Sequence, residues 1–278
     1  MLQKLKNFYH LGQAIAANIV YGFPSKKLQV IAITGTDGKT TTSTLVYHIL
    51  KTAGKKVALI STVAAYIGDD AIDTGFHVTT PSPFSLQKLL AKVAKADMEY
   101  VVLEVTSHGI DQNRVWGIHP TIAAITNVTH EHLDYHKTFE NYLNTKAKLL
   151  AESKNAILNR DAKDSYELLK NYCEENKIEY KSVGSDSLVS TVRSSVRERF
   201  GDQRYNYENS AVASAIAGLV GVKEKTIAQA IKTFPGVPGR MEEVTRAHGI
   251  KVIVDFAHTP NALEQALQSL KGKGRLIV

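Results

Sequence analysis

The sequence predicts an α/β protein whose central sheet is mostly parallel and is covered by helices on both faces. Short runs rich in β-branched residues alternate along the chain with longer amphipathic or alanine-rich segments. Glycine and proline stand at several of the junctions between these segments. Because parallel neighbours need a crossover connection, strands that alternate with helices indicate right-handed βαβ units.

The expected elements follow this alternation from residue 28 onward. Strands are predicted at 28–34, 57–60, 100–105, 121–127, 156–158 and 251–254, with a further strand beginning at 275–278. Helices are predicted at 39–53, 82–95, 138–150, 164–176, 209–220, 225–234 and 261–270. Residues 180–205 interrupt the alternation, and their Ser, Thr and Val content predicts a hairpin.

A Pro/Gly-rich stretch at 234–240, FPGVPGR, predicts a linker between domains. We therefore expect an N-terminal helical segment at 1–27, a central domain at 28–240, and the first strand–helix unit of a second α/β domain at 241–278. In the first segment apolar residues recur at helical spacing. This pattern favours an amphipathic helix packed on the main domain over a signal peptide.

Composition excludes several classes of protein. The chain is 44% hydrophobic and 22% charged, and no apolar run reaches the roughly 18 residues of a membrane span. The single cysteine, Cys173, excludes an internal disulfide and a thiolate metal site, and it suits a reducing cytosol. The net charge is +7, but Lys and Arg are scattered, so nucleic acid is not expected. Solvated lysines or a site for polyanionic small molecules explain the excess.

The strongest local signal is a glycine-containing loop at 35–41, GTDGKTT, which lies between a predicted strand and a predicted helix. Glycines bring backbone N–H groups close to phosphate oxygens, and the helix N-terminus adds unpaired donors. Lys39 adds a charge for the β- and γ-phosphates, and a hydroxyl of Thr40 or Thr41 can reach Mg²⁺. The glycine spacing is shorter than in the standard phosphate loop, but the strand–loop–helix setting favours phosphate binding over a plain turn.

Other polar residues near predicted strand ends have two readings each. Glu104 ends a strand, where it can hold Mg²⁺ or stand in solvent. Thr79 and Thr80 precede a helix, where they can bind an anionic substrate or cap the helix. Lys146 and Lys148, taken alone, indicate a solvated helix face. The histidines at 130–136 lack the ligand spacing or cysteine partner that zinc would require.

Three motifs in this order resemble those of the Mur ligases and their relatives, the folylpolyglutamate synthases. The chain reads TGTDGKTT at 34–41, EVTSHG at 104–109 and TNVTHEHLD at 126–134. Asp37 stands where the family usually has asparagine. An aspartate near phosphates is unfavourable unless it faces the metal or a backbone N–H group.

The resemblance implies a set of site residues for ATP and Mg²⁺. ATP would contact Gly35, Thr36, Asp37, Gly38, Lys39, Thr40 and Thr41, with Asn209, Arg240, Asp255 and His258 as further nucleotide contacts. One Mg²⁺ would bind Thr40 and Glu104, and a second would bind His132 with a carbamylated Lys146. His130 and His136 are expected at the surface. Lys39, Glu104, His132 and Lys146 are the expected catalytic residues.

The resemblance also implies a substrate and a reaction. Thr79, Thr80, Ser107, Gln112 and Arg114 match positions that bind UDP-MurNAc-dipeptide. The family's reaction is an ATP-dependent, ADP-forming ligation of an amino acid through an acyl phosphate. We also expect the enzyme to be cytoplasmic and monomeric. The family's uridine-gripping domain and most of a Rossmann-like last domain are not expected, so a compact or truncated ligase is predicted. The alternatives are folylpolyglutamate synthase-like, cyanophycin synthetase-like or lipid II-amidating ligases, and a non-catalytic nucleotide-binding module.

Overall fold

The computed structural model describes the whole chain except residues 1, 69, 73–78, 248–249, 259 and 273. The chain divides into two compact units, Met1–Thr233 and Phe234–Val278.

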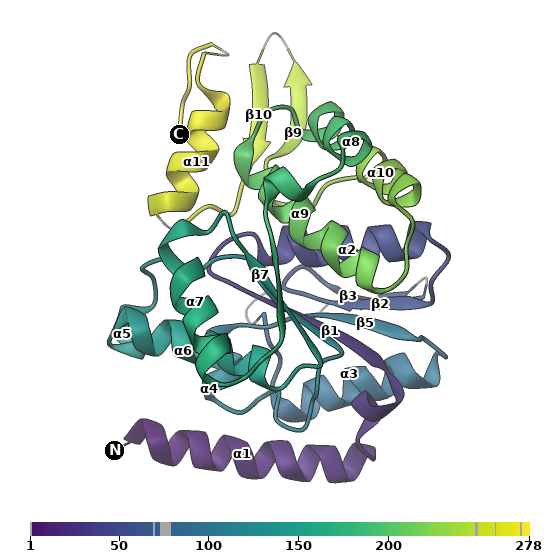
Figure 1. Cartoon of the computed structure of the whole chain (residues 1–278), viewed down its shortest axis with the longest axis vertical. Helices are drawn as coiled ribbons and strands as arrows, with labels where there is room; N and C mark the ends of the chain where they lie inside the picture. The colour runs from purple at the N-terminus through teal and green to yellow at the C-terminus, as the bar shows by residue number, and fades with distance from the viewer. Residues whose placement is uncertain (1, 69, 73–78, 248–249, 259, 273) are drawn as a thin grey trace. The chain divides into compact units, whose positions relative to one another are not determined.

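The first unit is built on an eight-stranded sheet among its described residues, in the order β4-β3-β2-β5-β1-β6-β7-β8. The six strands from β2 to β8 in that order are parallel, and β3 and β4 add an antiparallel edge. Figure 1 shows β1 near the middle of the sheet. The strands are β1 Gln29–Thr34, β2 Val57–Ile60, β3 Ala65–Ile67, β4 Asp70–Ile72, β5 Tyr100–Glu104, β6 Ile122–Ile125, β7 Asn155–Asn159 and β8 Tyr180–Val183.

Helices cover both faces of this sheet, as the alternation of strands and helices predicts (Figure 1). On one face α2 packs against α9 and α10, and α8 packs against α10; on the other, α1 packs against α3, and α6 against α4 and α7. The helices are α1 Leu2–Tyr21, α2 Lys39–Thr52, α3 Pro83–Lys95, α4 Ser107–Asp111, α5 Leu133–His136, α6 Phe139–Ala151, α7 Lys163–Glu175, α8 Ser190–Phe200, α9 Arg204–Leu219 and α10 Glu224–Lys232, with short 3₁₀ turns η1 Pro24–Lys27 and η2 Ser185–Ser187.

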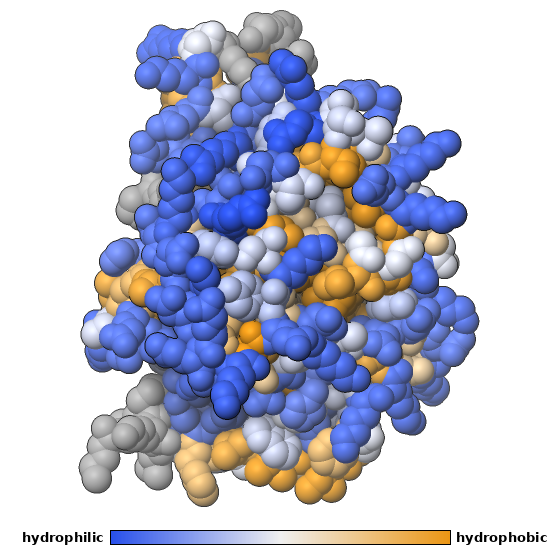
Figure 2. All heavy atoms as spheres, viewed as in Figure 1, coloured by the Kyte–Doolittle hydropathy of each residue, from blue (hydrophilic) through white to orange (hydrophobic). Residues whose placement is uncertain are grey.

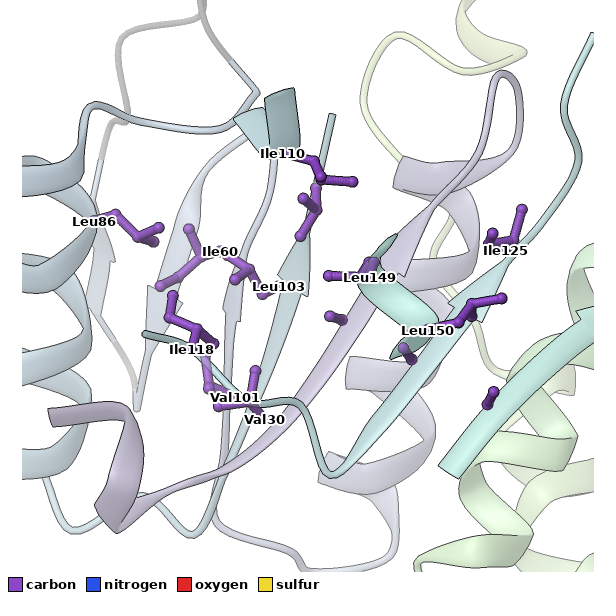
Figure 3. Close-up of a cluster of buried hydrophobic side chains, with 14 of the residues drawn as sticks. Val30, Ile60, Leu86, Val101, Leu103, Ile110, Ile118, Ile125, Leu149 and Leu150 are labelled. Carbon is purple, nitrogen blue, oxygen red and sulfur yellow. The ribbon is translucent and has the colours of Figure 1, made fainter. Parts of the chain in front are cut away.

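The core beneath one face of the sheet is a continuous cluster of aliphatic side chains (Figure 3). Leu86 of α3 and Leu149 of α6 reach it from the helices, and Val30, Leu103 and Ile125 reach it from the strands. The buried strands carry aliphatic residues on both faces, because a parallel sheet covered by helices has no solvent-exposed side. This packing holds the ends of β1, β5 and β6 in fixed positions relative to one another.

Two sequence-based predictions of secondary structure were wrong. The predicted hairpin at 180–205 consists of β8, η2 and the helix α8. Val192 and Val196 are both buried, and their spacing of four residues places them on one face of α8. The composition of this segment concealed that helical period. At the end of the chain, residues 275–278 form no strand, because a strand exists only where another segment pairs with it.

The second unit contains an antiparallel pair of strands and one helix. β9 Glu242–Ala247 pairs with β10 Ile250–Val254, with a shift of register between Val252 and Ile253, and α11 Pro260–Leu270 follows. The sequence predicted β10 and α11, whereas β3, β4 and β9 were not anticipated. In the described part of both units, no helix has the length and apolar character needed to cross a bilayer.

Candidate active site

The phosphate loop connects the end of β1 to the start of α2, as the sequence predicts. Gly38 has a φ angle of 78°, a conformation that side chains other than glycine adopt at a cost. A Cβ at Gly38 would overlap Oδ1 of Asn209, and one at Gly35 would overlap Oγ1 of Thr126. The loop can therefore take this path only with glycine at both positions.

Hydrogen bonds fix the loop to the residues that follow β6. Oγ1 of Thr126 donates to the carbonyl of Asp37 at 2.7 Å. The backbone N–H of Asp37 donates to Oδ1 of Asn127 at 2.9 Å, and that of Thr36 donates to the Asn127 carbonyl at 2.9 Å. Because these bonds come from residues that directly follow a buried strand, the loop is shaped before any ligand arrives.

The first residue of α2, Lys39, lies on this loop. Its Nζ donates to the carbonyl of Thr36 at 2.7 Å. The first N–H groups of a helix have no partner within the helix, and the helix dipole makes this end positive. Glycine turns, the positive end of a helix and a lysine together form a site that fits a polyphosphate.

Glu104, at the end of β5, lies beside the loop and is only 1% exposed. Its Oε1 accepts from the hydroxyl of Thr40 at 3.0 Å, and its Oε2 accepts from the backbone N–H of Thr62 at 3.0 Å. The alternative of a solvated glutamate was therefore wrong. A carboxylate and a hydroxyl side by side are the hard oxygen donors that Mg²⁺ prefers, so this pair fits that ion.

Thr62, which follows β2, was not predicted as a site residue. Its hydroxyl lies 3.0 Å from Oε1 of Glu104 and 3.0 Å from Oγ1 of Thr79. The only signal was its place just after a parallel strand, at the edge of the sheet where ligands bind. Thr62 thus links the expected metal ligand to the expected substrate residue Thr79.

Lys146 reaches the phosphate loop from α6 and is 1% exposed. Its Nζ donates to the carbonyl of Gly35 at 2.6 Å and lies 4.5 Å from the centroid of the Tyr142 ring. Burial lowers the pKa of Lys146 well below its ordinary value, and the positive charge of Lys39 adds a smaller effect in the same direction. The interpretation of Lys146 as part of a solvated helix face was wrong, whereas Lys148 is exposed.

A cluster of histidines lies next to this lysine. The His132 ring is 5.0 Å from that of His108 and 5.9 Å from that of Tyr142, centroid to centroid. The expectation that His136 lies at the surface was wrong, since it is buried with Nε2 3.0 Å from Oγ of Ser107. Burial lowers the pKa of His136 to about 4. His130 is exposed as expected, and it stacks on Phe139.

Burial also lowers the pKa of His132 and His108. Oε2 of Glu131 lies 3.8 Å from Nε2 of His132. Within the described residues, no group of three or more His, Cys, Asp or Glu side chains is arranged to hold a metal ion. The positive charge of Lys146 also acts to lower the pKa of His132.

Three of the expected substrate residues form one hydrogen-bonded group. Arg114 donates through one terminal nitrogen to the carbonyl of Thr80 at 2.7 Å, and through Nε to Oε1 of Gln112 at 2.9 Å. The alternative of helix capping at Thr79 and Thr80 was wrong, because Ser82 caps α3. The ordered guanidinium fits a carboxylate or phosphate.

The remaining expected nucleotide contacts are in both units. In the first, Oδ1 of Asn209 accepts from the hydroxyl of Thr42 at 3.2 Å. In the second, the Arg240 guanidinium lies 4.6 Å over the Phe256 ring, and Asp255 accepts from the backbone N–H of Met241 at 2.6 Å. Nδ1 of His258 is 2.9 Å from the Phe256 carbonyl.

Comparison with known families assigns the chain to one of them. Residues 33–228 match the Mur ligase middle domain, and residues 239–278 match the Mur ligase glutamate ligase domain. The chain belongs to the Mur ligase family.

Relatives of this Mur ligase chain carry a specific name. Proteins named UDP-N-acetylmuramoyl-L-alanyl-D-glutamate--2,6-diaminopimelate ligase from Clostridium botulinum and Bacteroides fragilis are 38% and 37% identical to it, over 95% and 94% of this chain. The matches cover 58% and 57% of those proteins. The chain therefore spans little more than half the length of the curated relatives it matches.

Solved structures have the same fold as this Mur ligase chain. A structure of UDP-N-acetylmuramoyl-L-alanyl-D-glutamate--2,6-diaminopimelate ligase aligns with a TM-score of 0.68 and 28% identity, over 88% of this chain and 54% of that one. The apo form of L. casei FPGS aligns with a TM-score of 0.74 over 99% of this chain and 81% of that one, at 15% identity. The second likeness concerns the fold alone.

Proposed function

We propose that this chain is the ATP-binding part of an ADP-forming ligase that adds an amino acid to UDP-MurNAc-L-Ala-D-Glu. The observation that carries the proposal is the pairing of a glycine phosphate loop with the buried carboxylate of Glu104, which lies 3.0 Å from the hydroxyl of Thr40. Membership of the Mur ligase family and the names of the relatives support the peptide-ligase reaction.

The phosphate loop would hold the triphosphate of ATP. Its backbone N–H groups and the ammonium of Lys39 face the charge of the β- and γ-phosphates. Thr40 and Glu104 would hold Mg²⁺, which when bound neutralises charge on the transferring phosphoryl group. Asn209 would contact the adenine, with Arg240, Asp255 and His258 as further nucleotide contacts.

Lys146 and His132 would hold a second Mg²⁺ after carbamylation of the lysine. Carbamylation needs an uncharged amine, since only the free lone pair of the nitrogen can attack carbon dioxide. Burial of Lys146 supports this step because it lowers the pKa of the amine. The carbamate would also place an anion within the electrostatic reach of the ammonium of Lys39, which would favour it.

The proposed reaction has two steps. The terminal carboxylate of the dipeptide attacks the γ-phosphorus, the bond to ADP breaks, and an acyl phosphate forms. The amine of the incoming amino acid then attacks the acyl carbon, phosphate leaves, and the amine loses a proton to form the amide. Thr79, Thr80, Ser107, Gln112 and Arg114 would hold the muramyl substrate. The domain division at residues 27 and 240, a cytoplasmic location and a monomeric state belong to the same proposal.

Calorimetry of ATP binding tests the first part of the proposal. We expect magnesium-dependent association of ATP with the 278-residue chain and its loss in Lys39→Ala. A matched control is Lys51→Ala, which removes a lysine from the other end of the same helix. Absence of magnesium-dependent binding, or equal binding by both variants, would overturn the proposal.

A phosphate-release screen tests the substrate. It would supply UDP-MurNAc-L-Ala-D-Glu with candidate amino acids to this chain and to any longer form of it. Phosphate release with folate and glutamate but not with the muramyl dipeptide would assign a folylpolyglutamate synthase-like activity. ATP binding without turnover of any substrate, even with a complete C-terminal domain supplied, would assign a non-catalytic nucleotide-binding module.

A further inference from the structure

The N-terminal helix α1 turns an apolar face away from the rest of the first unit. Phe8 is 74% exposed, Ile19 64% and Val20 68%. Gly12 and Ala16, the small residues between them, are exposed as well. We call Phe8, Tyr9, Gly12, Ile15, Ala16, Ile19 and Val20 the outward stripe; it contains no charged residue. Figure 2 shows orange side chains along the lower edge of the molecule, where Figure 1 places α1.

Polar anchors fix the rotation of α1 that exposes this stripe. Nδ2 of Asn18 donates to the carbonyl of Trp116 at 3.0 Å, and Nδ2 of Asn7 donates to Oδ2 of Asp111 at 2.9 Å. Nδ2 of Asn113 donates back to the Asn7 carbonyl at 3.2 Å. A helix on a protein surface normally turns its apolar face inward. Here two asparagines face inward, so rotating α1 to bury the stripe would break these bonds.

The charge around the outward stripe has one sign. Residues 1–27 contain Lys4, Lys6, Lys26 and Lys27 and no aspartate or glutamate. The side chains of Lys6, Lys26 and Lys27 are exposed. An apolar stripe flanked by lysines at both ends matches a surface that is apolar inside and anionic outside. That is the chemistry of a bilayer interface containing anionic lipids.

A second copy of this chain fits the stripe less well. In a two-fold antiparallel pair of α1 helices, Lys6 of one copy would lie near Lys26 and Lys27 of the other. No acidic residue in the first 27 positions offsets this repulsion. The charge pattern therefore favours a lipid surface over self-association.

We propose that α1 docks this protein onto anionic lipid surfaces by laying its outward stripe into the interface. The helix lies in the plane of the surface, and Lys6, Lys26 and Lys27 contact lipid phosphates. The membrane is not crossed: within the described residues no helix is suited to span it. This proposal is independent of the ligase reaction, since it uses no residue of the phosphate loop or of the expected substrate site.

Vesicle flotation of the 278-residue chain tests the proposal. We expect the chain to float with vesicles of phosphatidylcholine and phosphatidylglycerol, to float less with pure phosphatidylcholine, and to be released by salt. Ile19→Asp and Phe8→Asp are expected to weaken binding by about tenfold or more, because each places a charge in the outward stripe, which would lie in the apolar part of the interface. The matched control is Leu168→Asp, since Leu168 is an exposed leucine of α7.

A second pair of variants tests the charge. Lys26→Gln with Lys27→Gln is expected to weaken binding to anionic vesicles, whereas Lys223→Gln with Lys225→Gln, at exposed lysines near α10, leaves it unchanged. Unchanged thermal unfolding of each variant, followed by circular dichroism, shows that the fold is intact. No flotation of the unaltered chain, or equal flotation of the stripe variants and their control, would overturn the proposal. So would a dimer in light scattering that Ile19→Asp abolishes in the absence of vesicle binding.

Discussion

The phosphate loop at 35–41 and the histidine–lysine region from α4 to α6 lie side by side, yet they are made in different ways. The loop would bind through backbone groups, and its shape depends on glycines and on the start of α2. The neighbouring region is made of side chains such as Lys146 and His136, whose charge states depend on burial. A site made of backbone groups can be predicted from the sequence, because only glycine fits the conformations that its loop requires. A side-chain site takes its chemistry from tertiary contacts.

The largest effect is expected when a glycine of the phosphate loop is given a methyl side chain. Gly38→Ala should weaken ATP binding by roughly a hundredfold, because the added Cβ would overlap Oδ1 of Asn209 and displace the loop backbone. The control is Gly54→Ala, where φ is also positive at 74° but no atom lies within 4 Å of the added Cβ. Calorimetry should find normal ATP binding in the control. Equal affinities in the two variants would show that the loop does not bind through its backbone.

Loss of the charge on Glu104 comes next. Glu104→Gln keeps the shape of the side chain but removes the anion, so the Mg²⁺ concentration needed for half-maximal ADP binding should rise about tenfold or more. Glu99→Gln, at an exposed position just before β5, should leave the magnesium titration unchanged. If the variant needs no additional magnesium, Glu104 is not a ligand of the Mg²⁺ ion.

Lys146 should make stability depend on pH below the ordinary pKa of a lysine. Its folded-state pKa is lowered, so between that pKa and the ordinary value the unfolded chain binds a proton that the folded chain does not. The free energy of unfolding should therefore rise with pH in this window, by at most about 1.4 kcal/mol per pH unit. Urea unfolding of Lys146→Met should show a flatter dependence, whereas Lys148→Met, at the exposed lysine of α6, should keep it. An unchanged slope in Lys146→Met would mean that Lys146 is charged in the folded state.

His136 should make stability depend on pH on the acid side. The pKa of His136 is about 4 in the folded chain, and an unfolded histidine has a value near 6.5. As the pH falls through this window the unfolded chain gains a proton first, so His136 should lower the free energy of unfolding by about 3 kcal/mol. His136→Gln should remove this loss in acid unfolding experiments, and His130→Gln, at an exposed histidine, should not. Equal acid sensitivity of both variants would argue that His136 is solvated.

Much of the fold could be predicted because its signals are local. The strand–glycine–helix transition at 34–39, the alternation of elements and the position of Glu104 each depend on residues close together in the chain. The helix α8 was missed because two buried valines four residues apart are a weak signal within a polar segment. Thr62 and His108 were missed as site residues because only the packing of β2, α4 and α5 brings them to the site.

By itself, the sequence determined the parallel α/β architecture, the place of the phosphate loop and the Mur ligase motifs, since short-range periodicity and residue type are sufficient for these. Only the tertiary structure decided that Lys146 and His136 are buried, that Glu104 is held by Thr40 and Thr62, and that α1 turns its apolar stripe outward. The physical reason is the distance along the chain: Lys146 meets Gly35 across 111 positions and Asn7 meets Asp111 across 104. Burial, and the protonation state that follows from it, comes from such contacts.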